Sequence, residues 1–320
     1  MDFQKQKEQV ALLSVASNSA LVLVKFIVGF VIGSVSIISE AIHSGVDLLA
    51  SLIALVSVKT SSKPADEVHS FGHGKIENIS GTVEALLIFA AAGWIIYEAV
   101  QKISKPEPID DLGWGIGVML ASSAVNAFVS KRLFTIGRKT NSIALQADAW
   151  HLRTDVYTSA GVMAGLALIW CGQLFFPGVN LYFLDPVAAI AVALLIIKVA
   201  YNLTMESVKD LLDAKLPTEE EEFIEKEILK YEDSLHGYHR LRTRKAGHIR
   251  FVDFHIKVNP HMSVIDSHAI TDQISKNIEQ RYPDTSVTIH VEPCEGGCDE
   301  DCLNGCLMSE KERNKIRQIK

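Results

Sequence analysis

Six long apolar segments constrain the fold of this 320-residue chain more than any other feature. Each approaches the ~20 residues that a helix needs to cross the hydrocarbon core of a bilayer. We expect these helices at residues 11–32, 37–58, 78–103, 112–134, 143–175 and 184–208. The first follows a polar N-terminus that has no small-residue cleavage site, so we interpret it as an anchored helix. The sequence therefore predicts a membrane all-α bundle of six transmembrane helices.

Lysine and arginine residues gather in two of the loops between these segments. The second loop holds Lys59, Lys63 and Lys75, and the fourth holds four basic residues between positions 131 and 139, whereas the first and fifth hold none. Because cytoplasmic loops collect basic residues, we place the second and fourth loops inside the cell. With six spans, both termini are then cytoplasmic, and we expect a multi-pass protein of the inner (cytoplasmic) membrane.

The distribution of charge divides the chain into parts. Residues 1–208 contain only 16 of the 38 acidic and 14 of the 31 basic residues. We expect a transmembrane domain over residues 1–208, a soluble domain over 209–293, and a Cys-rich charged tail without stable structure over 294–320. Helix and strand patterns in the soluble part follow the order αββαβ, which indicates a small sandwich with helices on one side of an antiparallel sheet.

Two function classes are disfavoured by composition. The net charge of −7 and the lack of a basic stripe with interleaved aromatic residues argue against a nucleic-acid partner. Five cysteines in a chain of this length, four of them in the tail, do not form a disulfide framework.

A His-x3-Asp pattern occurs twice within apolar segments, as His43/Asp47 and as His151/Asp155. Side chains at i and i+4 share one face of a helix. Two neutral imidazoles and two carboxylates supply four ligands whose net charge of −2 balances a divalent cation where the dielectric is low. Interhelical hydrogen bonding is the alternative explanation. Because ionisable residues at membrane depth indicate function, we favour a metal site between two helices.

A second group of metal-ligand types lies in the second loop. Asp66, His69 and His73 are spaced as ligands of a surface metal site, since imidazole is the commonest transition-metal ligand. The alternative is a polar loop with incidental histidines.

The soluble domain carries seven of the eleven histidines. Alternation along strands can aim two of these, His255 and His290, at one another. The tail has a further regular pattern, with cysteines at every fourth position: Cys294, Cys298, Cys302 and Cys306. Thiolates bind zinc tightly, but three glycines argue against the stable helix that would align them, so a tail metal site and an unstructured end both stay open.

Together, the two His-x3-Asp pairs, the loop His69-Ser-Phe-Gly-His73-Gly-Lys75 and the small α+β domain resemble the cation diffusion facilitator family. The resemblance covers about residues 10–293 and is closest to the bacterial YiiP-like zinc and iron efflux branch. It implies a ferredoxin-like, metallochaperone-like cytoplasmic domain, a homodimer, and export of a metal ion from the cytosol in exchange for protons by alternating access.

The resemblance also assigns residues. It implies that the four His/Asp residues form the transport site, that Asp66, His69 and His73 bind zinc, and that Lys75 pairs with Asp213 between the domains. For the cytoplasmic domain it implies a binuclear site near the dimer interface, formed by His239, His255, His268, His290 and Glu292.

The residue at position 43 departs from the closest branch, where aspartate is frequent. Replacing a carboxylate by the imidazole of His43 favours Zn²⁺ over Mn²⁺ or Mg²⁺. We therefore expect zinc as the bound and transported ion, with cadmium, cobalt or iron as further substrates.

Two other classes fit the sequence less well than a secondary active transporter. A membrane zinc enzyme needs an open coordination position and a general base, but here four ligands are available and no H-E-x-x-H motif occurs. A membrane-anchored cytoplasmic zinc sensor would explain the histidine-rich domain and leave the four intramembrane ligands unexplained.

Overall fold

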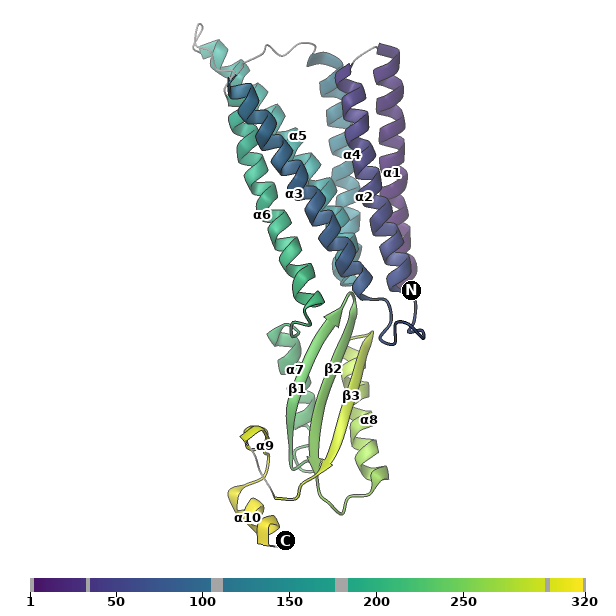
Figure 1. Ribbon diagram of the computed structural model, residues 1–320, viewed down its shortest axis with the longest axis vertical. Helices are drawn as coiled ribbons and strands as arrows, with labels where there is room; N and C mark the ends of the chain where they lie inside the picture. The colour runs from purple at the N-terminus through teal and green to yellow at the C-terminus, as the bar shows by residue number, and fades with distance from the viewer. Residues whose placement is uncertain (1–2, 33–34, 105–111, 176–183, 297–299, 319–320) are drawn as a thin grey trace. The chain divides into compact units, whose positions relative to one another are not determined.

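A computed structural model (Figure 1) describes residues 3–32, 35–104, 112–175, 184–296 and 300–318. The chain divides into two compact units, Met1–Leu211 and Leu212–Lys320. The first unit is built from helices, and the second combines a three-stranded sheet with helices. This is the expected fold class, whereas the exact three-part division at residues 208 and 293 stays a prediction.

Six long helices form the first unit. They are α1 (Phe3–Ile32), α2 (Val35–Ser61), α3 (Lys75–Ser104), α4 (Leu112–Lys139), α5 (Ile143–Phe175) and α6 (Leu184–Leu211). Most are longer than expected at one end, because polar residues extend a helix beyond its apolar part. Helix α1 begins in the polar N-terminus, and α4 continues through the basic residues up to Lys139.

Within the described residues, four stretches are long and apolar enough to cross a membrane: Phe3–Val31, His43–Ser61, Lys75–Gln101 and Pro186–Leu211. The expected count of six spans is therefore not confirmed. The two other expected spans, in α4 and α5, stay predictions.

The six helices pack in pairs, with α1 on α2, α3 on α6, and α4 on α5. Small residues lie at these contacts, including the fully buried Ala85, Ala92, Ala147 and Ala200 around Ile196. Small side chains allow close approach of helix backbones, which is how membrane helices associate without a hydrophobic driving force.

The second unit follows the order α7, β1, β2, α8, β3, as expected. Its elements are α7 (Thr218–Leu229), β1 (Gly237–Ala246), β2 (Ile249–Val258), α8 (Val264–Arg281) and β3 (Thr285–Pro293). The expectation of an antiparallel sheet was wrong in part, because β1 pairs antiparallel with β2 whereas β3 pairs parallel with β2. The 18-residue helix α8 connects β2 to β3, and a helical crossover returns the chain in the same direction.

The two faces of this sheet differ in chemistry. On one face, Phe254 and Ile256 of β2 pack against Ile228 of α7 and Ile274 of α8, all of them buried to less than 1 % exposure. Successive side chains of a strand point to opposite faces, so the odd-numbered residues of β2 point away from α7 and α8. The other face therefore receives the polar side chains of β2, including His255.

The tail was expected to lack stable structure, and its described part differs from that expectation. Helices α9 (Glu300–Asn304) and α10 (Glu310–Gln318) form there. The start of α10 is a capping box, in which Glu312 accepts from the backbone N–H of Ser309 and from its hydroxyl, at 2.8 and 2.6 Å. This local signal favours a helix despite the glycines that precede it.

Candidate metal sites

The two His-x3-Asp pairs meet between α2 and α5. Ligand atoms of His43, Asp47 and Asp155 lie within 4.8 Å of one another. His151 joins them, because its Nε2 lies 3.1 Å from Oδ1 of Asp47. The structure thus brings all four residues together. A shared helix face explains the position of the two residues within each pair, but it does not require the two pairs to meet.

Neighbouring helices add polar groups that sequence analysis missed. Asn126 of α4 donates from Nδ2 to Oδ2 of Asp155 at 3.5 Å, and Asn18 of α1 donates to the backbone oxygen of Asp47 at 3.4 Å. Buried Lys25 of α1 donates to the hydroxyl of Ser44, next to His43, at 2.8 Å. Each is a single polar residue within an apolar segment, and that was the available signal.

The loop between α2 and α3 gathers its three expected ligands. Oδ1 of Asp66 lies 3.5 Å from Nδ1 of His69, and its Oδ2 lies 3.3 Å from Nε2 of His73. The backbone N–H groups of His69 and Val68 donate to Asp66 at 2.7 and 3.0 Å. The hydrogen bond from the His69 N–H is the largest reason that the pKa of Asp66 is lowered, so the carboxylate stays ionised and able to bind a cation.

A row of three histidines crosses the polar face of the cytoplasmic sheet. Strand register places His239 of β1 opposite His255 of β2, and His255 opposite His290 of β3. Their ring centroids are 5.1 and 4.8 Å apart along this row. Ligand atoms of His239, His255 and Glu292 lie within 4.8 Å of one another. We call His239, His255 and His290 the histidine row.

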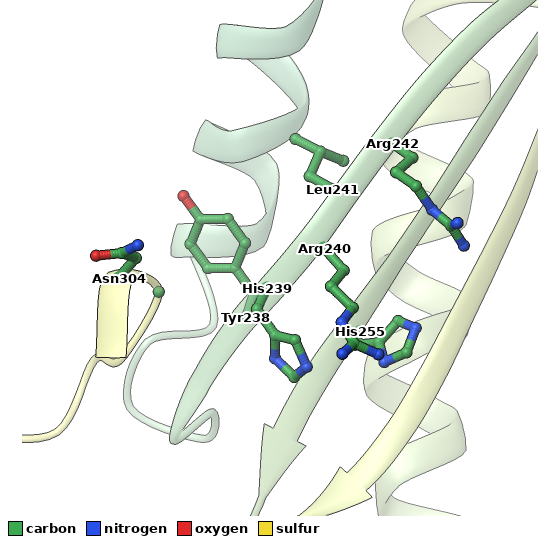
Figure 2. A pocket seen from close by; sticks show the side chains of 8 residues that line it. Tyr238, His239, Arg240, Leu241, Arg242, His255 and Asn304 are labelled. Atoms are coloured by element: carbon green, nitrogen blue, oxygen red, sulfur yellow. The ribbon is translucent and has the colours of Figure 1, made fainter. Parts of the chain in front are cut away.

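A β-bulge shapes the cavity beside this row. The register of β1 shifts between His239 and Arg242, and Arg240 adopts a φ of 53°. The extra residue of a bulge redirects the side chains next to it. Figure 2 shows the imidazoles of His239 and His255 side by side on neighbouring strands, at a cavity of about 550 Å³ that Asn304 also lines.

Charge in the histidine row centres on Glu292. Its Oε1 lies 2.8 Å from Nδ1 of His255, and its Oε2 lies 3.6 Å from Nε2 of His239 and 2.5 Å from Nζ of Lys257. Burial raises the pKa of Glu292, but the hydrogen bonds from Lys257 and His255 outweigh it and lower the pKa to about 2. Burial is the largest effect on His239 and lowers its pKa, which favours the neutral imidazole that a metal needs.

Both the loop group and the histidine row fit a metal ion by donor chemistry. Each combines imidazoles with an ionised carboxylate, the set that zinc takes in proteins. Among the described residues, the buried Nδ1 atoms of His73 and His239 have no hydrogen-bond partner. The ammonium of Lys257 is the feature that opposes a cation at the histidine row, and no sequence pattern predicted its position there.

Several expected ligands are not gathered. His268 is exposed on α8, which packs on the opposite face of the sheet from the histidine row. Within the described part of the tail, no cysteine belongs to a metal-ligand group: Cys294 is buried and Cys302 and Cys306 are half-buried thiols. Cys298 lies outside the described residues.

The expected pair of Lys75 and Asp213 joins the two units and stays a prediction. Within the first unit, Lys75 donates to the backbone oxygen of Leu211 at 3.4 Å. Within the second, Asp213 accepts from Arg244 at 3.4 Å.

Comparison with protein families decides the class of this protein. The model described as the cation efflux transmembrane domain matches residues 11–212, and that of the cation efflux protein cytoplasmic domain matches residues 216–294. The chain belongs to the cation diffusion facilitator family. As a member of this family it is a membrane cation efflux transporter and not a classical enzyme, which confirms the coarse expectation of a transporter.

Curated relatives span nearly the whole chain. An uncharacterized transporter of Synechocystis, sll1263, is 36 % identical over 285 residues, covering 89 % of this chain and 90 % of the relative. The cation-efflux pump FieF of Salmonella newport is 33 % identical over 287 residues, covering 89 % and 92 %. These relatives support the YiiP-like branch of cation diffusion facilitators.

Solved structures match the cytoplasmic part. The metal-bound C-terminal domain of the CzcD transporter from Thermotoga maritima is 35 % identical, covers 27 % of this chain and 100 % of its own, and has a TM-score of 0.23. The Zn form of CzrB is 35 % identical and covers 27 % and 97 %, with a TM-score of 0.24. The matched family model of the cytoplasmic domain ends at residue 294, before the greater part of the tail.

Proposed function

We propose that this cation diffusion facilitator exports Zn²⁺ from the cytosol in exchange for protons. The observation that carries the proposal is the convergence of His43, Asp47, His151 and Asp155 between α2 and α5. Two imidazoles and two carboxylates complete a tetrahedral set for zinc without an added ligand. Such a complete set suits transient binding of a cargo ion better than catalysis, which needs an open position.

Exchange follows from the contact between His151 and Asp47. A hydrogen bond joins Nε2 of His151 to Oδ1 of Asp47 at 3.1 Å, so a proton lies between two atoms that are also metal ligands. Zn²⁺ can bind both atoms only when that proton leaves, because metal ligands must be deprotonated. The reverse holds on the side with more protons, where protonation of the same atoms releases zinc.

Movement of the site is attributed to the two helices that carry it. Helices α2 and α5 contact each other, although α2 packs most extensively on α1 and α5 on α4. Rigid-body movement of α2 and α5 relative to neighbouring helices would open the site to alternate faces of the membrane, as in other transporters with sites between helices. The basic second and fourth loops support six spans with both termini in the cytoplasm of a multi-pass inner-membrane protein.

Zinc is proposed as the cargo because of His43. An imidazole in place of a hard oxygen ligand favours Zn²⁺ and disfavours Mn²⁺. Cadmium and cobalt share enough of this ligand preference to be further substrates, and iron is a weaker one. The relative named FieF does not settle the metal of this chain.

Two further proposals concern the parts outside the membrane. We propose that Asp66, His69 and His73 bind a modulatory zinc ion, and that the histidine row with Glu292 binds zinc in the cytoplasmic domain of a homodimer. The contacts of each group support these proposals. The family assignment favours transport over a membrane-anchored zinc sensor, in which the intramembrane ligands would have no use.

Transport into proteoliposomes tests the proposed function. Wild-type protein should take up zinc faster when the lumen is acidic than when both sides have equal pH, and Asp47→Asn should abolish this uptake. Asp272→Asn, which changes an exposed carboxylate of α8 that belongs to no proposed metal site, is the control and should retain most of it. Equal uptake by wild type and Asp47→Asn would show that this site does not carry transport. Uptake that is independent of the proton gradient would contradict the exchange of zinc for protons.

A further inference from the structure

A basic cavity lies between the end of α4 and the start of α5, apart from the three candidate metal sites. Its volume is about 250 Å³. The side chains that line it combine three cations with two aromatic rings and one hydroxyl: Lys131, Phe134, Thr135, Arg138, Trp150 and Arg153. Among the described residues no carboxylate lines the cavity, which therefore presents positive charge and hydrogen-bond donors to a ligand.

The cations of this cavity keep their charge available. In the part of the chain that the structure describes, Lys131, Arg138 and Arg153 form no ion pair with a carboxylate. Arg153 donates instead to the hydroxyl of Ser130, at 3.4 Å. Guanidinium groups bind carboxylate and phosphate oxygens with matched geometry, so three cations without a carboxylate partner around one cavity indicate a place for an anion.

Aromatic contacts fix the two guanidinium groups. The ring of Phe134 lies 5.1 Å from the guanidinium carbon of Arg138 and 5.3 Å from that of Arg153. Trp150 packs edge-on against Phe134, with centroids 5.0 Å apart. Stacking over a ring holds a guanidinium while leaving its N–H edge free to donate, so the donors are oriented before a ligand binds.

The cavity continues an apolar strip of the same helix. Residues 128, 131, 135 and 138 follow the spacing that places side chains on one face of α4. The first of them, Phe128, is 55 % exposed, and two apolar residues that precede it on α4, Leu120 and Val125, are 48 % and 36 % exposed. An exposed apolar face that ends in a basic cavity fits a ligand with an apolar chain and an anionic head better than it fits a free anion.

We propose that this cavity binds the phosphate headgroup of an anionic phospholipid, with its acyl chains along the exposed face of α4. Arg138 and Arg153 contact the phosphate oxygens, and Lys131 adds a third positive charge at the rim. Basic pockets between membrane helices bind such headgroups. The proposed orientation makes this the cytoplasmic leaflet, but binding itself does not depend on the direction of transport or on the metal.

Lipid retention by the full-length protein tests this proposal. We would measure phospholipid bound to the purified protein by native mass spectrometry, after exchange into mixed phosphatidylglycerol and phosphatidylcholine. Wild-type protein should retain phosphatidylglycerol preferentially, and Arg138→Gln/Arg153→Gln should lower that retention at least tenfold. The single variant Lys131→Gln changes an exposed side chain and should lower it severalfold without risk to folding.

The matched control for Lys131→Gln removes one charge from the same end of α4 outside the cavity. Lys139 lies over Phe3 and does not line the cavity, whereas Arg132 lies over Phe128 on the proposed acyl-chain face and is left unchanged. Lys139→Gln should retain phosphatidylglycerol as wild type does. Equal loss in this control, or no lipid preference in wild type, would overturn the proposal.

A final arm separates lipid from free anion. Millimolar inorganic phosphate should leave the retention of phosphatidylglycerol unchanged, since it lacks the apolar chain. Displacement of the lipid by phosphate would show that the cavity binds a soluble anion, and this result would overturn the assignment of a phospholipid. The experiment measures bound lipid and not zinc transport. A failure of the proposed zinc transport would therefore leave all of these lipid measurements unchanged.

Discussion

Nζ of Lys257 lies 2.5 Å from Oε2 of Glu292, on the face of the sheet that carries the histidine row. The ammonium therefore forms an ion pair with the carboxylate oxygen that the proposed zinc ion needs. Hydrogen bonding to Glu292 raises the pKa of Lys257, although burial, the largest effect, acts in the opposite direction. An internal cation of this kind competes with a metal for the same oxygen.

Removing that competitor should strengthen zinc binding. We expect Lys257→Met to raise the zinc affinity of the cytoplasmic domain about tenfold, equivalent to ~1.4 kcal/mol, because it frees Glu292 and removes a like charge. Zinc titration of the full-length protein in an Asp47→Asn background would measure it. Lys276→Met, which breaks an exposed pair with Asp272, is the control. Unchanged or weaker affinity in Lys257→Met would show that the ammonium does not compete.

The low pKa of Glu292 sets a pH window for stability. The pKa of Glu292 falls from an ordinary value of 4.5 to about 2 on folding. The contribution of the ionised carboxylate to the free energy of unfolding is therefore complete above pH 4.5 and is lost as the pH falls towards 2. Glu292→Gln should lower the free energy of unfolding at pH 7 by no more than about 1 kcal/mol, because solvent screens this pair. Denaturant unfolding with a chelator present should show the difference closing below pH 4.5. A difference that persists at pH 2 would contradict this linkage.

The buried pair of Lys7 and Glu77 ties the starts of α1 and α3 together. Nζ of Lys7 lies 3.2 Å from Oε1 of Glu77, which also accepts from Ser61 of α2 at 2.9 Å. Lys7→Met leaves Glu77 charged and buried and should destabilise the bundle by roughly 3–5 kcal/mol. Thermal unfolding in detergent would measure it, and Lys7→Met/Glu77→Gln should recover most of the loss. Equal losses in the single and double variants would contradict the pairing argument.

Metal choice should depend on position 43. We expect His43→Asp to lower the preference for Zn²⁺ over Mn²⁺ about tenfold, because a hard oxygen replaces an imidazole. Competitive uptake of the two ions into proteoliposomes would measure this preference. The corresponding loop variant His69→Asp should leave the preference for Zn²⁺ over Mn²⁺ unchanged. An unaltered preference in His43→Asp would show that His43 does not determine metal selectivity.

The tail pairs with the sheet through two backbone hydrogen bonds. Tyr238 donates to the oxygen of Gly305 at 2.9 Å, and Leu307 donates to that of His236 at 3.1 Å. A Cβ at Gly305 would collide with the carbonyl oxygen of Tyr238. Gly305→Val should therefore undock the tail and raise amide exchange at Tyr238 and Leu307 at least tenfold by mass spectrometry. Asn304→Ala should not, and protection that survives Gly305→Val would mean that the pairing is dispensable.

Local patterns predicted the elements of this protein better than their pairing. Apolar length predicted the helices, and alternation predicted the three strands, since both signals lie within one segment. The parallel pairing of β3 and the alignment of His239, His255 and His290 depend on register between distant segments. No local pattern records which residues face each other across strands.

The same limit applies to the candidate sites. Spacing placed His43 and Asp47 on one helix face, but the contact of Asp47 with His151 joins residues 104 positions apart. Lys257 was missed because its effect comes entirely from the neighbouring strand. His268 was expected from family resemblance, and the fold places its helix on the other side of the sheet.

The docked tail has a consequence for contacts between molecules. Strand β1 is the outer strand of its sheet, and Gly305 and Leu307 occupy backbone groups of Tyr238 and His236 on its open side. An uncovered strand is a template for pairing with another chain, which leads to aggregation. The isolated bridge between Gly237 and Cys306 thus pairs the start of this edge strand with a segment of the same molecule. A segment beyond the matched family domains thereby covers the start of this edge strand and leaves less of it open to pairing with another chain.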